Sequence, residues 1–249
     1  MHKFFYITLI LALLISGCKT KKENKENIET ENIEEEYFFP EEVPYYQNIT
    51  EAIPDKFYPI GWSKDGNFAY LIEPADEALG NYMMGIVIIS TVSNEVLWDW
   101  YTEPEVEEDL YREEIWSKEY DKFKEKLNKY KIIQQRNIKL HDAYFNYKEK
   151  DYVVWLETDL VKDADFGIDL VGGSTLYIKS PQMGKKEIIN RKYEASMILT
   201  QQIAGCLISP YEDRIAVIVR NERIGYEGPP NIIEFEVFGT NLTTSFIKK

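Results

Sequence analysis

Short runs in which apolar side chains alternate with polar ones recur along most of the chain, and this is the pattern of β-strands. Three stretches share one outline of strand, tight polar turn, strand, loop and strand; they are residues 57–100, 138–192 and 205–242. The first two stretches add a short turn and a fourth strand. Because such repetition indicates one structural unit used several times, we expect a mainly β body made of antiparallel meander units.

Two local patterns within these stretches make sharper predictions. Asp65-Gly66 can supply the positive-φ residue of a tight turn, so we expect a hairpin there. Tyr152–Leu156 and Ile215–Val219 are apolar at successive positions. Strands of this kind are typical of sheets that are covered on both faces, so we expect both to be buried on two sides.

The spacing of the apolar residues changes between the first and second stretches. Residues 105–130 are rich in charge and contain neither glycine nor proline. Their large apolar side chains follow spacings of 4, 3, 4 and 3, which place them on one stripe of a helix: Trp116, Tyr120, Phe123, Leu127 and Tyr130. We predict one amphipathic helix over about residues 105–131, inserted after the first four strands and packed on its own sheet. The alternative is a helix that fills a groove in a partner.

The N-terminus has a different character. A positive charge at Lys3 precedes the apolar run Phe4–Ile15, which as a helix would be about 18 Å long, too short for a hydrocarbon core of about 30 Å. This pattern predicts a secretory signal. The run ends in Ile15-Ser16-Gly17-Cys18, which resembles the lipobox of bacterial lipoproteins.

That resemblance implies cleavage before Cys18 and a lipid attached to its sulfur, with the new amino group acylated. The alternative is an ordinary signal peptide that happens to contain a cysteine. Residues 19–36 are mostly lysine, glutamate, asparagine and threonine, a composition typical of a disordered spacer. We therefore divide the chain into a signal peptide (1–17), a lipidated and disordered tether (18–45) and one β-rich domain (46–249).

Charge and cysteine content restrict the function further. The formal net charge is −14, which argues against a nucleic-acid partner because such partners demand clustered lysine and arginine. If Cys18 carries lipid, Cys206 is alone and no intramolecular disulfide forms. We expect Cys206 to be a small buried side chain. No cofactor fingerprint is present, and we expect no cofactor.

Two loops carry candidate binding chemistry. Residues 221–231 hold two glycines and two prolines, and we treat Arg223, Tyr226 and Glu227 as a candidate ligand-binding set; the alternative is a long hairpin connection. Asp163, Asp165 and Asp169 alternate through residues 162–174, which we predict to be a glycine-rich loop, and such oxygen ligands could hold calcium. The spacing does not match an EF-hand, so the alternative is an acidic surface loop.

Catalytic chemistry has few candidates. His141 is the only histidine beyond the predicted signal peptide, and it lies in a probable strand, residues 139–145, next to Asp142. A lone histidine of this kind is more often a surface or core residue than a catalytic one. A zinc site needs several cysteine or histidine ligands, which this sequence does not offer.

The body also resembles known families. Gly61-Trp62-Ser63-Lys64-Asp65-Gly66 resembles the W-S-P-D-G repeat of secreted TolB-like, WD40-like propeller proteins, and Leu207–Pro210 resembles a second, degenerate copy. The order of this hairpin, the segment Leu127–Ile132 and the segment Gly225–Pro229 is similar to that of a family of predicted secreted bacterial proteins of unknown function. The resemblance implies strand–turn–strand units and no particular activity. Because a propeller usually has about 4–8 blades and three units are visible, an irregular propeller and a β-sandwich both stay open.

These patterns together predict a lipid-anchored lipoprotein of the bacterial cell envelope, on the periplasmic side or the outer surface of the outer membrane. Its expected role is a non-enzymatic binding or scaffold module for a protein or an extracellular ligand. The alternative is a carboxylate-dependent hydrolase, whose two acidic side chains would face each other across a pocket at about 5–9.5 Å.

Overall fold

The computed structural model describes residues 38–44, 52–75, 82–102, 110–163, 167–194, 196–225 and 228–248. These residues belong to one compact unit, Phe38–Lys249. Cys18 and the predicted signal peptide lie outside the described residues.

The first repeated stretch forms one antiparallel sheet, which we call the first sheet. Its strand order is β5-β4-β3-β2-β6, with β2 at Lys56–Trp62, β3 at Asn67–Glu73, β4 at Gly85–Ser90, β5 at Val96–Tyr101 and the two-residue β6 at Ile133–Gln134. The predicted hairpin turn is confirmed between β2 and β3, where Gly66 has a φ of +89°. The Ser63 hydroxyl accepts a hydrogen bond from the Asn67 amide at 2.8 Å and closes the same turn.

The second and third stretches form the other two sheets of the described chain. The outer sheet, from the second stretch, has the order β11-β10-β9-β8, with β8 at Tyr144–Tyr147, β9 at Lys150–Lys162, β10 at Asp169–Ser180 and β11 at Gly184–Lys192. The central sheet, built on the third stretch, has the order β1-β14-β13-β12-β7, with β1 at Ala52–Pro54, β7 at Leu140–His141, β12 at Ile198–Ile208, β13 at Arg214–Arg223 and β14 at Asn231–Asn241. Only the β1–β14 pairing among these described ladders is parallel. The prediction of a mainly β fold made of antiparallel units is therefore confirmed.

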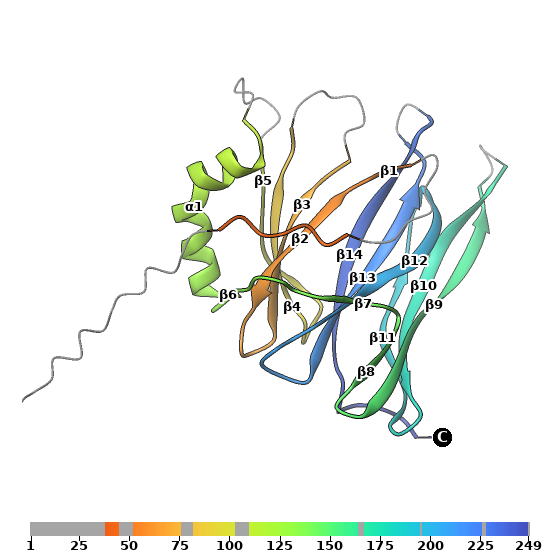
Figure 1. Cartoon of the computed structure of the whole chain (residues 1–249). Helices are drawn as coiled ribbons and strands as arrows, with labels where there is room; N and C mark the ends of the chain where they lie inside the picture. The colour runs from red at the N-terminus through yellow and green to blue at the C-terminus, as the bar shows by residue number, and fades with distance from the viewer. Residues whose placement is uncertain are drawn as a thin grey trace, which may run out of the picture. The chain divides into compact units, whose positions relative to one another are not determined.

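The three sheets stack face to face with the third unit in the middle (Figure 1). One apolar core joins the first and central sheets and includes Phe57, Trp62 and Phe235. A second core joins the central and outer sheets and includes Tyr152 and Val217. In a propeller the blades follow one another around an axis in the order of the chain. Here the third unit lies between the first and the second, which is the arrangement of a layered sandwich.

The stacking of the sheets determines which apolar strands are buried on both faces. Ile215–Val219 in β13 is buried at every position, as predicted, because the central sheet has a neighbour on each face. The same prediction for Tyr152–Leu156 in β9 is wrong. Val153 is 38% exposed, because the far face of the outer sheet is open to solvent.

The predicted helix is α1, Arg112–Lys129. Residues 103–109, where we expect its first turn, lie outside the described residues. Trp116, Phe123 and Leu127 are buried against the free face of the first sheet, and Tyr120 and Tyr130 lie at the edge of the same core. The stripe therefore packs on the protein's own sheet, and the prediction of an amphipathic covering helix is confirmed.

Two irregular segments cross the strands (Figure 1). The first, residues 38–44, we call the strap; its Val43 amide donates to the Phe57 carbonyl at 3.0 Å, and Phe39 packs on the rings of Tyr58 and Trp116. The second, residues 135–143, we call the crossover; it follows β6 of the first sheet and contains the two-residue β7 at the edge of the central sheet. The compact unit thus begins at the strap, within the segment that the sequence analysis assigns to the tether.

Candidate functional site

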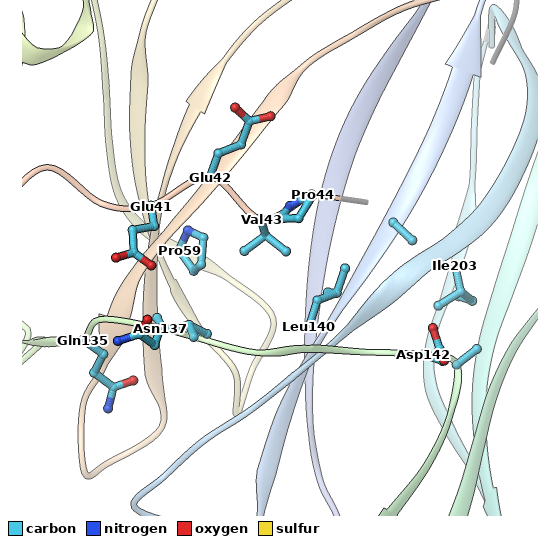
Figure 2. Close-up of a pocket in the computed structure, with 13 residues that line it drawn as sticks. Glu41, Glu42, Val43, Pro44, Pro59, Gln135, Asn137, Leu140, Asp142 and Ile203 are labelled. Atoms are coloured by element: carbon cyan, nitrogen blue, oxygen red, sulfur yellow. The ribbon is translucent and has the colours of Figure 1, made fainter. Parts of the chain in front are cut away.

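The strap and the crossover form the two walls of a groove of about 470 Å³ (Figure 2). Its floor comes from β2 and β12, which belong to different sheets. Figure 2 shows Glu41 of the strap directed toward the crossover, where Gln135 and Asn137 lie, and Asp142 close to Ile203 at the other end. The groove therefore places one carboxylate near each end of a shared surface.

Among the described residues that line this groove, three have negatively charged side chains and none has a positively charged one. The acidic ones are Glu41, Glu42 and Asp142. Arg136 lies on the crossover, but its guanidinium stacks over the Phe38 ring at 4.2 Å and is not part of the lining. Because the whole chain also carries a charge of −14, the potential in this groove favours a cation.

Most of the remaining lining is apolar: Val43, Pro44, Pro59, Ile138, Leu140, Ala143, Ile203 and Ala204. Pro59 has no amide hydrogen, so β2 offers no backbone donor at that residue. The groove therefore combines an apolar floor with carboxylates near its ends.

A second cavity, of about 420 Å³, lies beside β14 and β1. It is bounded by the ends of β3 and β5 from the first sheet and by polar side chains of β13 and β14. Arg223 Nε lies 2.7 Å from Glu234 Oε1 in this lining. Arg191 reaches Glu236 Oε1 at 2.6 Å, so both glutamates of β14 are paired with an arginine.

A hydrogen-bonded network stands behind one wall of this second cavity. Gln201 Nε2 donates to the Tyr193 hydroxyl at 3.0 Å and to Asn221 Oδ1 at 2.8 Å. Asn221 Nδ2 in turn donates to Glu236 Oε2 at 2.9 Å. Each polar side chain in the network holds the next in place, so the wall is preorganised.

Asp55 joins the first and central sheets at the same cavity and is only 4% exposed. Its two carboxyl oxygens accept the Ala75 amide at 2.8 Å and the Phe235 amide at 3.4 Å. Burial raises the pKa of Asp55 from 3.8 to about 7, because the charged form loses hydration, and nearby Glu234 acts in the same direction.

This raised pKa makes stability depend on pH. Between about pH 4 and pH 7 the folded protein keeps the Asp55 proton that the unfolded chain has lost, so the Asp55 contribution to stability falls as pH rises through that window. The full span is about 4 kcal/mol at most, from roughly 1.4 kcal/mol per pKa unit. We expect Asp55→Asn to become relatively more stable than wild type as pH rises. Urea unfolding of both proteins at pH 5 and pH 8 measures this, and an unchanged difference between them would contradict it.

The structure places only some of the predicted site residues. Arg223 lines the second cavity, whereas Tyr226 and Glu227 lie outside the described residues. Arg223 is the last residue of β13, so it belongs to a strand and not to a loop, and β13 pairs antiparallel with β14. The binding role of the three residues stays a prediction.

The acidic stretch around Asp163 is partly different from our expectation. Asp163 follows β9, Asp169 begins β10, and Asp165 lies outside the described residues. Gly172 and Gly173 lie within β10 beside a register shift, so they are part of a strand and not of the loop. Within the described ranges, no three acidic, histidine or cysteine side chains come together in a way that could hold a metal ion.

His141 and Cys206 occupy paired positions of β7 and β12, a proximity that sequence spacing could not indicate. Cys206 is fully buried, as predicted, and burial raises the pKa of its thiol. A reactive cysteine needs the opposite shift. Burial also lowers the pKa of the half-buried His141, with Lys139 adding to the effect. We therefore assign Cys206 to the core.

The fold and the cavities define a class of protein: a sandwich of three stacked β-sheets with one covering helix, an acidic and apolar groove, and a second cavity with a polar wall. No protein-family model, curated protein or solved structure matches the chain. In the part of the chain that the structure describes, no helix has the length and apolar character needed to span a membrane.

Proposed function

We propose that the protein is a lipid-anchored binding module of the bacterial cell envelope whose groove takes a basic, partly apolar peptide segment of a partner protein. One observation carries the proposal: the groove between strap and crossover combines acidic groups at its ends with an apolar floor, and its described lining has no basic side chain. A peptide with a lysine or arginine next to apolar residues complements both features.

Two features of the sequence support the location. The segment Ile15–Cys18 resembles a lipobox, and the charged spacer after it would hold the body away from the membrane. The strap follows this spacer directly in the sequence, so one wall of the groove comes from the first residues of the body after the proposed tether.

The alternative of a carboxylate-dependent hydrolase has weaker support. Asp55, Glu234 and Glu236 line one cavity, but each glutamate is paired with an arginine. Both oxygens of Asp55 accept backbone amides. These contacts give the carboxylates structural partners, so we favour binding over hydrolysis.

Two matched peptides test the proposed ligand. They share the same apolar residues and differ only in carrying two lysines or two glutamates, and each is titrated into the protein by fluorescence anisotropy. We expect the basic peptide to bind at least about tenfold more tightly, with an affinity that falls as salt is raised. Equal affinities for the two peptides, or binding of neither, would refute the proposed ligand class.

A further inference from the structure

We propose that the second cavity, beside β14 and β1, is a binding site for a neutral saccharide. This site is separate from the groove, and the proposal does not depend on the peptide ligand. Three observations support it: the pairing of charges in the lining, the fixed hydrogen-bonding groups of one wall, and an exposed aromatic ring at the rim.

The charged side chains at the cavity are already paired with one another. Arg223 contacts Glu234, and Arg191 contacts Glu236. A charged ligand would have to compete with these pairs, whereas an uncharged ligand can bond to their remaining lone pairs and N–H groups. The raised pKa of Asp55, caused mainly by burial, also leaves this carboxyl largely uncharged below neutral pH.

The wall offers donors and acceptors in fixed positions. Tyr193, Asn221 and Glu236 line the cavity. Gln201 donates hydrogen bonds to Tyr193 and Asn221, and Asn221 donates one to Glu236, so all three side chains are held in place. Adjacent hydroxyl groups of a sugar each donate one hydrogen bond and accept others, which suits such a mixed wall. Because the groups are ordered before binding, little conformational entropy is lost when the ligand enters.

Tyr101 supplies an apolar surface at the rim. Tyr101 is 43% exposed, and its ring lies against Gly85, where a Cβ atom would collide with it. The ring is therefore held in place while still reaching solvent, and the C–H face of a sugar can stack on it. The cavity volume of about 420 Å³ is in the range of small-ligand sites and has room for one or two sugar rings.

The test is a titration of the intact protein by saturation-transfer NMR and calorimetry. The probes are glucose, galactose and N-acetylglucosamine with their disaccharides, and the charged analogues glucosamine and glucuronic acid. We expect at least one neutral saccharide to bind, at least about tenfold more tightly than its charged analogue. Tyr101→Ala and Glu234→Gln should each weaken binding at least about tenfold, and Tyr144→Ala, which removes an exposed tyrosine of the outer sheet, should not.

Three results would overturn the site. The first is that no neutral saccharide of the panel binds; the second is that the charged analogues bind as well as the neutral ones. The third is that Tyr101→Ala and Glu234→Gln, with native circular dichroism, bind saccharide as wild type does. The basic peptide would occupy the groove, so it should not displace the saccharide from the second cavity. Failure of one proposal would therefore leave the other unaffected.

Discussion

Trp116→Ala is expected to lower the free energy of unfolding by about 3–5 kcal/mol, the usual cost of truncating a large buried aromatic side chain. Trp116 is fully buried between the helix and the first sheet. Its ring contacts those of Phe39 in the strap and Tyr120 and Phe123 in the helix, at centroid distances of 5.8, 5.9 and 5.4 Å. The cavity left by alanine would lie where three segments meet, so none of them can close it alone.

Urea unfolding followed by tryptophan fluorescence and circular dichroism measures this loss. Asp121→Ala is the matched control, because it removes an exposed side chain from the same helix and should change stability by less than about 0.5 kcal/mol. A loss below about 1 kcal/mol for Trp116→Ala would show that the helix does not pack on the sheet as described.

Glu73→Ala is expected to lower the free energy of unfolding by about 2–3 kcal/mol, because it leaves the buried Tyr58 hydroxyl without its acceptor and removes the charge that the partly exposed Lys56 and Arg112 share. The Glu73 carboxylate accepts the Tyr58 hydroxyl at 2.6 Å and the Lys56 ammonium at 3.0 Å, and it lies 3.3 Å from the Arg112 guanidinium at the start of α1. Burial acts to raise the pKa of Glu73, but the bonds from Tyr58 and Lys56 outweigh it, and the pKa lies below its ordinary value. Burial and the bond to Glu73 raise the pKa of Tyr58.

The sign of the pH dependence follows from that lowered pKa. The contribution of Glu73 is present above the pKa of a glutamate in the unfolded chain and is lost as pH falls through the folded value. Unfolding of wild type and Glu73→Ala at pH 7 and pH 3 should therefore show a large difference at pH 7 and a smaller one at pH 3. Tyr58→Phe, which keeps the ring and removes one hydroxyl, is the control and should cost less than Glu73→Ala. An equal loss at both pH values would mean that packing, and not charge, explains the effect.

The sequence was sufficient to predict the units and insufficient to predict how they stack. Alternation and turn residues are local, so they identified the three meanders and the stripe of α1. Stacking depends on contacts between distant strands, and Tyr152–Leu156 shows the difficulty. On the open face of the outer sheet, Trp155 stacks on Tyr177 at 5.2 Å, and Lys185 lies over both rings. An apolar strand can thus be covered by its own neighbours without a further sheet.

The candidate sites were predictable only in part, for the same reason. Arg223 stood out because the sequence after it is rich in glycine and proline; in the structure it ends β13 and lines a cavity. The groove brings together residues near 41, 59, 140 and 203, which no local pattern connects. Its only local signal is the pair Glu41-Glu42, which lies between Pro40 and Pro44. By sequence this pair belongs to a charged tether, whereas the structure shows that Phe39 and Val43 beside it pack on the body.

The most direct test of the binding groove is the affinity of the basic peptide for two double variants of equal charge. Glu41→Gln/Asp142→Asn removes a carboxylate near each end of the groove, and Glu119→Gln/Glu125→Gln removes two from the helix. We expect the groove variant to bind at least about tenfold more weakly than wild type and the helix variant to bind as wild type does. Equal affinity of the two variants would contradict the groove as the site, because only the overall charge of the protein would then matter.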